Sequence, residues 1–166
     1  RSFALKDAVE FADASANGLT GKNVTIQMLV PSHTIKEPIT AAHGSKKITI
    51  TTASRSDKTY PYMGNEGTQA KLVRGYDGDS LITSTNDLEI NNITMDGNGD
   101  SYTGNLAGGL LHTKKGSINS ALILSGNTLL SNSVLDKSMS DEISDGGAVY
   151  VHDGCSLVMT DQAKID

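Results

Sequence analysis

The hydrophobic positions follow a helical spacing at the start of the chain and a strand spacing after it. Within residues 3–14, apolar side chains recur every three or four positions from Leu5 to Ala12, and Ser2 stands where a helix N-cap is expected. The Asn17-Gly18 pair tolerates left-handed backbone angles and ends this pattern. Short aliphatic and β-branched stretches then alternate with clusters of Gly, Asn, Asp and Ser. The pattern predicts one helix followed by strands and turns.

The predicted strands are short. Turn signals at Asp77-Gly78 and Asp96-Gly97 are not flanked by matched strands, which disfavours hairpins and a β-sandwich. We predict strands at residues 24–30, 34–35, 48–52, 72–73, 81–83, 88–95, 110–112, 121–124, 128–130, 148–151, 157–159 and 163–165.

Similar segments recur along the second half of the chain. Those at Leu88, Leu122 and Leu157 each open with two apolar residues two positions apart, and they begin 34 and 35 residues apart. Gly-Gly pairs begin at Gly108 and Gly146, 38 residues apart, and each precedes an apolar stretch. A recurring unit of this length predicts a solenoid whose coils contain short strands.

Each repeating unit has room for a loop. Three short strands with tight turns need roughly 20 to 25 residues, so a unit of about 35 leaves about ten. The polar stretches Gly97–Leu106 and Ser133–Asp145 fit this description. We expect both loops to emerge on one side of the stack and to make its contacts. Residues 1–20 are then a helix that caps the N-terminal end, and residues 21–166 are the solenoid.

Several segments carry a resemblance to a known family. They are Gly146–Val149 (GGAV), Gly108–Leu111 (GGLL), Leu129–Asn132 (LLSN) and the opening FALKDAVEFADA, which VTIQMLV follows. They resemble the Gly-Gly-Ala-aliphatic and Phe-x-x-Asn repeats of chlamydial polymorphic outer-membrane proteins and Gram-positive adhesins, which have pectin-lyase-like folds. Leu129 stands where that family often has Phe.

The resemblance implies an all-β fold, namely a right-handed parallel β-helix with an N-terminal capping α-helix. It also implies an extracellular location, at the bacterial cell surface or secreted, within a larger parent protein that continues into other domains. The implied partner is a host or cell-surface protein or a glycan.

Composition and charge restrict the classes of partner. The net charge is -5, and the only dense basic runs are Lys46-Lys47 and Lys114-Lys115. Two separated pairs are too few to gain much from counterion release, so we expect no nucleic acid partner. No stretch approaches the ~20 apolar residues that span a bilayer. The single cysteine, Cys155, excludes an internal disulfide.

One segment has the residue spacing of a calcium loop. Asp96, Asn98 and Asp100 place oxygen-bearing side chains at alternate positions. Position 107, where an EF-hand would have Glu, is Ala. Calcium is therefore the one candidate cofactor, and an ordinary polar turn is the alternative.

Five other residues are candidates for ligand contact. Tyr60, Tyr62 and Tyr102 lie in polar, loop-like segments, and tyrosine rings stack on sugar faces. Lys71 and Arg74 are the basic residues nearest a carboxylate cluster, where they would neutralise an acidic polysaccharide.

No catalytic residue is predicted. The chain lacks a Gly-x-Ser-x-Gly elbow and polygalacturonase-like Gly-His-Gly and Arg-Ile-Lys segments, and its four His residues lack metal-ligand spacing. Enzymatic activity stays open, but the residues favour a non-enzymatic adhesin or scaffold that makes contacts through extruded loops. The alternatives are a polysaccharide-binding or pectate-lyase-like glycan-active β-helix, with or without a dependence on calcium, and a spacer stalk.

Overall fold

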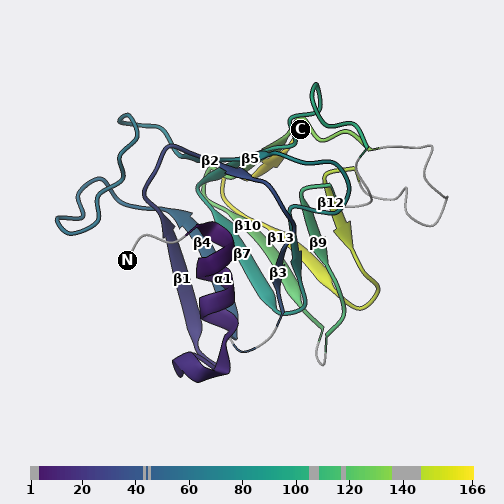
Figure 1. Cartoon of the computed structure of the whole chain (residues 1–166), viewed down its shortest axis with the longest axis horizontal. Coiled ribbons are helices and arrows are strands. Elements are labelled where there is room, and N and C mark those ends of the chain that lie inside the picture. Colours follow the sequence, from purple (N-terminus) through teal and green to yellow (C-terminus); the bar gives the residue numbers. More distant parts are fainter. Residues whose placement is uncertain (1–3, 43, 45, 105–108, 117–118, 136–146) are drawn as a thin grey trace.

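The computed structural model describes residues 4–42, 44, 46–104, 109–116, 119–135 and 147–166. Within these residues it contains one α-helix, a short 3-10 helix and strands arranged in three parallel sheets (Figure 1). The chain is therefore mostly β, and its pairing pattern is compatible with a parallel β-helix.

Successive strands pass through the three sheets in turn, and each pass through all three makes one coil of the stack. Sheet A contains β1 (Asn23–Met28), β4 (Lys47–Thr52), β7 (Asp87–Asn91), β10 (Ala121–Ser125) and β13 (Ser156–Met159). Sheet B contains β2 (Ser32–Ile35), β5 (Ala70–Arg74), β8 (Ile93–Asp96), β11 (Leu129–Ser131) and β14 (Lys164–Ile165). Sheet C contains β3 (Ile39–Ala41), β6 (Ile82–Ser84), β9 (Leu111–Thr113) and β12 (Val149–Val151).

The strand register confirms the repeats that the sequence predicts. Leu122 lies opposite Leu88 on one side and opposite Leu157 on the other, which reproduces the offsets of 34 and 35 residues. Val149 lies opposite Leu111, in agreement with the offset of 38 residues between the Gly-Gly pairs. Because these rows are parallel and in register, equivalent side chains stack from coil to coil.

The interior of the stack is aliphatic. Side chains alternate between the two faces of each strand, so every second residue points inward. In β7, Leu88 and Ile90 are buried while Glu89 between them is not. Each sheet contributes fully buried side chains to one core, among them Ile50 and Ile90 from sheet A, Leu72 and Met95 from sheet B, and Ile82 and Leu111 from sheet C.

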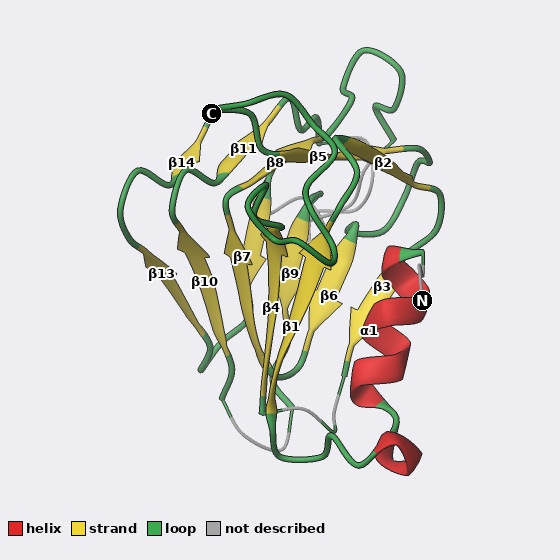
Figure 2. Ribbon diagram, turned by 90° about the vertical axis from the view of Figure 1, so that its left-hand side faces the viewer, coloured by secondary structure: helices red, strands yellow, loops and turns green. Residues whose placement is uncertain are grey.

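The helix α1 (Leu5–Asp13) packs at the N-terminal end of the stack, against β3 and β1 (Figure 2). Its buried residues, Leu5, Val9 and Ala12, form one face of the helix. The N-cap residue is Ala4, which makes no side-chain cap, and the predicted cap Ser2 lies outside the described residues. A 3-10 turn, η1 (Ser15–Asn17), follows and ends at Gly18 with a φ of 68°.

The structure divides one predicted strand and contains one strand that was not predicted. The predicted strand 88–95 is two strands, because Asn92 has a φ of 50° and turns the chain from sheet A to sheet B. Equivalent corners in the next coils are at Gly126, with φ 62°, and Asp161, with φ 59°. The strand that the sequence pattern did not predict is β3, which has only three residues.

The predicted loops leave the stack at one corner, between sheets B and C. The Gly99 amide donates to the Asn132 carbonyl at 3.0 Å, so the starts of the two loops lie side by side. A Cβ on Gly97 would collide with the backbone of Asn132 and Ser133, which requires glycine there. Residues 105–106 and 136–145 of the predicted loops lie outside the described residues.

Close approach of the neighbouring coil accounts for one of the two described glycines of the Gly-Gly pairs. A Cβ on Gly109 would lie 2.9 Å from the Gly147 carbonyl of the neighbouring coil. A Cβ on Gly147 would meet nothing within 4 Å, so close packing does not account for glycine at that position.

Candidate functional site

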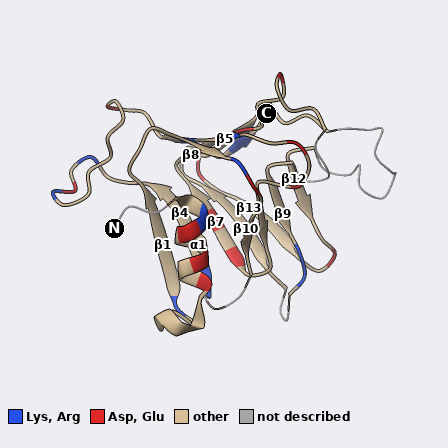
Figure 3. Ribbon diagram, viewed as in Figure 1, with Lys and Arg blue, Asp and Glu red and all other residues tan. Residues whose placement is uncertain are grey.

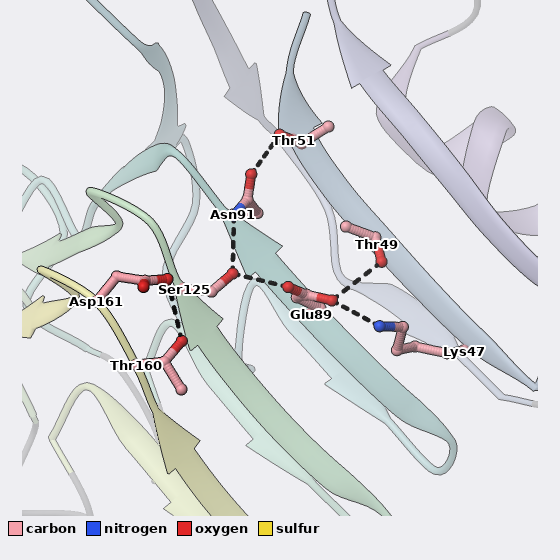
Figure 4. Close-up of polar contacts among 8 residues, drawn as sticks. All are labelled: Lys47, Thr49, Thr51, Glu89, Asn91, Ser125, Thr160 and Asp161. Atoms are coloured by element: carbon pink, nitrogen blue, oxygen red, sulfur yellow. Dashed lines mark hydrogen bonds and ion pairs between the residues drawn. The ribbon is translucent and has the colours of Figure 1, made fainter.

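A connected row of polar side chains lies on the outer face of sheet A (Figure 4). The Lys47 ammonium lies 2.7 Å from Glu89 Oε2, and the Ser125 hydroxyl donates to Glu89 Oε1 at 2.7 Å. Asn91 donates to Ser125 Oγ at 2.8 Å and accepts from the Thr51 hydroxyl at 2.8 Å. These contacts join strands β4, β7 and β10. We call Lys47, Thr49, Thr51, Glu89, Asn91 and Ser125 the sheet A polar network.

Glu89 is the charged centre of this network. Burial raises the pKa of the Glu89 carboxyl. Hydrogen bonds from Lys47, Ser125 and Thr49, together with the positive charge of Lys47, lower this pKa by more than burial raises it. The net pKa lies below its ordinary value, so Glu89 is ionised at neutral pH and paired with Lys47. A general acid needs the opposite shift, toward a raised pKa, and the pairing therefore suits a stable contact better than proton transfer.

Polar contacts continue beyond the network, in the turn after β13. The Thr160 hydroxyl donates to the Asp161 carboxylate at 3.3 Å (Figure 4). The same carboxylate accepts from the Gly126 amide at 3.0 Å, and one coil earlier Asn92 Oδ1 accepts from the Asn127 amide at 2.9 Å. Side chains at these corners thus bind the backbone of the adjacent coil.

A second ion pair lies on the outer face of sheet B. Lys71 Nζ is 2.6 Å from Asp96 Oδ2, and Asp96 Oδ1 accepts from the Asn132 amide group and the Asn98 backbone. Burial raises the pKa of Asp96, whereas Lys71, Asn98 and Asn132 lower it to a net value below the ordinary one. Asp96 is therefore another ionised carboxylate whose side-chain partners, Lys71 and Asn132, lie on neighbouring coils.

The three predicted calcium ligands have different surroundings. Asp96 is committed to Lys71, the Asn98 side-chain amide donates to the Arg74 carbonyl at 3.1 Å, and Asp100 is exposed. No group of three or more His, Cys, Asp or Glu side chains that could hold a metal ion occurs among the described residues. Calcium binding at Asp96, Asn98 and Asp100 stays a prediction.

Arg74 is buried, in contrast to the expected surface position. It is 0% exposed, and its guanidinium donates to the carbonyls of Tyr76 and Asp79, each at 3.1 Å, and of Gly109. The Tyr76 ring lies 5.1 Å from the guanidinium carbon, and burial raises the pKa of Tyr76 to about 12. A buried guanidinium needs hydrogen-bond acceptors, and these carbonyls supply them. Arg74 thereby links the turn after β5 to the next coil.

The predicted tyrosines do not form one surface. Tyr62 is 4% exposed, so its ring belongs to the packed interior, whereas Tyr60 is 55% exposed. Both lie in the segment 53–69 between β4 and β5, while Tyr102 follows β8. The two segments leave different corners of the stack (Figure 1), and the structure does not bring Tyr60 and Tyr102 together.

The sheet A polar network was not among the predicted site residues. Its signal is present in the repeats, where Glu89 and Asn91 alternate with Leu88 and Ile90. Polar residues that alternate with buried ones lie on the outer face of a strand. Figure 3 shows the charged residues spread over several elements, so charge density alone does not mark this face.

Comparisons with models of known families, with curated proteins and with solved structures gave no match. Within the described part of the chain, no helix has the length and apolar character that crossing a membrane requires.

Proposed function

We propose that this chain is a non-enzymatic scaffold or adhesin domain of a bacterial cell-surface or secreted protein. The supporting observation is that the ionised carboxylates Glu89 and Asp96 each pair with a lysine of a neighbouring coil. Such contacts hold coils together and leave these carboxylates without the raised pKa of an acid catalyst. The stack then serves as a stiff support, and its loops make the contacts.

We further infer a right-handed parallel β-helix. After each strand the chain passes through the other two sheets and then returns to the first sheet, where its next strand lies parallel to the previous one. Connections between parallel strands of one sheet are right-handed in about 98% of cases, because the strand twist favours that path.

The loop between β4 and β5 is the strongest candidate for contact with a partner. Tyr60 and Met63 in this loop are 55% and 65% exposed. Exposed aromatic and methionine side chains are enriched at protein interfaces. A host or cell-surface protein is therefore the partner that these residues favour.

Glycan binding is the second candidate, and the sheet A polar network supports it. Hydroxyl, amide and charged groups lie in a row across three strands, and such groups donate to and accept from sugar hydroxyls. A calcium-dependent contact at Asp96, Asn98 and Asp100 would belong to this second role.

One binding experiment separates these roles. The protein is applied to arrays of glycans, polyuronates and purified extracellular-matrix proteins, with calcium or with a chelator. We expect the protein to bind to the protein probes of the array. The double variant Tyr60→Ala/Met63→Ala should abolish this binding, whereas Asn91→Ala should leave it unchanged. The reverse pattern would favour the glycan role. Release of reducing or unsaturated sugar ends would overturn the non-enzymatic proposal.

A further inference from the structure

One edge of β1 faces away from β4, and no hydrogen bond to its backbone between Asn23 and Gln27 occurs among the described residues. In parallel sheets, alternate residues direct their N–H and C=O groups to opposite sides of the strand. The carbonyls of Lys22 and Met28 accept from Lys46 and Ala53, at 2.9 and 3.0 Å, so the even-numbered residues face β4. The backbone groups of Asn23, Thr25 and Gln27 therefore point to the other edge. β1 pairs with no strand besides β4 among the described residues.

The chain itself closes the C-terminal end of this edge, where the Met63 amide donates to the Leu29 carbonyl at 2.7 Å. At the N-terminal end the Gly21 amide donates to the Gly44 carbonyl, in the segment that leads into β4, so this contact lies on the paired side. Within β1 the outward-directed backbone groups are thus those of Asn23, Thr25 and Gln27, which corresponds to an added strand of about five residues.

An apolar cleft of about 350 Å³ runs along the same edge. Ala8 and Phe11 of α1 line one side of it, and Val24 and Ile26 of β1 line the other. Phe11 is 45% exposed, and Val24 and Ile26 are only partly buried. The inward-facing side chains of a strand added to β1 would enter this cleft, next to Val24 and Ile26.

We propose that this edge binds an extended peptide segment of another protein, with aliphatic residues at two alternate positions. The backbone of the segment pairs with Asn23, Thr25 and Gln27, and its aliphatic side chains fill the cleft. This is strand addition, in which the main chain supplies affinity and the cleft supplies specificity. It adds a binding site that is distinct from the sheet A polar network and that borders the β4–β5 loop at Met63.

The dimensions favour a peptide over a second copy of the chain. A stable interface between folded proteins buries about 1,200–2,000 Å² in total, whereas the open edge has three residues. The helix α1 also stands beside this edge, over β3 and β1, where the further sheets of a second stack would have to lie (Figure 2).

The probe is a fluorescent peptide that copies β4, Lys47–Thr52, because its two isoleucines occupy the rows of Val24 and Ile26 on the other side of β1. We expect saturable binding by fluorescence anisotropy. Two further peptides are N-methylated at the isoleucine positions or at the alternate threonine positions. One of them should lose about tenfold or more in affinity and the other should retain it, because only one set of amides faces β1. Equal binding of the two, or no binding of the parent peptide, would overturn the proposal.

Protein variants locate the site. In Thr25→Pro the lost N–H points away from β4, so the native pairing is kept while an added strand is blocked. Ala8→Phe fills the cleft from the helix side. We expect either change to abolish peptide binding. Binding that survives both changes would place the peptide on another edge and refute the site. Self-association that Thr25→Pro removes would identify a second copy as the occupant and overturn the peptide proposal.

Discussion

The ion pair between Lys47 and Glu89 should stabilise the stack by joining two coils. The two residues are 42 positions apart in the chain and lie on neighbouring strands, with 2.7 Å between Nζ and Oε2. Their side chains are 31% and 18% exposed, so the contact is partly screened by water. We predict that Lys47→Met and Glu89→Gln each destabilise the protein, and that the double variant costs less than the sum of the two.

The expected coupling energy is about 1 kcal/mol. Exposed ion pairs contribute roughly 0.2–1 kcal/mol, and hydrogen bonds to charged groups roughly 1.5–3 kcal/mol. The partial exposure of both side chains places this pair near the top of the first range. An energy of about 1 kcal/mol changes the unfolding equilibrium about fivefold, which urea denaturation resolves.

The assay is a double-mutant cycle from urea denaturation, repeated at neutral and acidic pH. The lowered pKa of Glu89 means that the unfolded state takes up a proton before the folded state does as the pH falls. The stability that this carboxylate contributes is therefore fully present at neutral pH, above its ordinary pKa. It is lost as the pH falls through the lowered pKa. The difference between the parent protein and Glu89→Gln should shrink accordingly.

A second ion pair supplies the control. Lys6 and Glu37 lie 2.6 Å apart, but their side chains are 34% and 64% exposed. We expect Lys6→Met and Glu37→Gln to couple more weakly than the sheet A pair. If Lys47 and Glu89 show no coupling at neutral pH, or a coupling that acid leaves unchanged, the idea that charge pairs join the coils is wrong.

Three further predictions concern the core, a corner and a histidine. Ile90→Ala should cost about 2–5 kcal/mol in chemical denaturation, because its side chain is fully buried; a cost below 1 kcal/mol would contradict the packed interior. Gly97→Ala should lower the melting temperature clearly more than Gly104→Ala, since only the first Cβ would collide with backbone, and equal effects would refute the steric argument. Burial lowers the pKa of His112 to about 4, so the folded protein should lose stability as the pH falls from about 6.5 toward 4. The variant His112→Gln should lose less stability over this range, which thermal melts at the two pH values would measure.

The repeats could be recognised from sequence where the coils have similar lengths. Leu88, Leu122 and Leu157 are spaced by nearly constant intervals, so self-similarity found the register of sheet A. The earlier coils hide the same register, because Asn23 and Lys47 are 24 residues apart while Lys47 and Asp87 are 40 apart. The long segment between β4 and β5 accounts for the second interval, and no periodicity reveals it.

The site residues were harder to predict, because their partners are distant in the chain. Arg74 stands near acidic residues in sequence, yet it points inward and binds backbone carbonyls that carry no sequence signal. Tyr62 looks like a loop residue, but its segment folds back so that the ring packs beside Gly64. Glu89 could have been recognised as outward-facing from alternation, whereas its pairing with Lys47 depends on the register of two strands.

The unequal coils have a consequence for how the molecule grows in length. Neighbouring strands of sheet A are separated by 24, 40, 34 and 35 residues, yet each step advances the stack by one strand spacing of about 4.8 Å. The length of the molecule along the stack therefore depends on the number of coils and not on the number of residues in each coil. Insertions at a corner widen the molecule locally and leave the distance between the two ends of the stack unchanged. The width across the stack and the length along it can therefore change independently.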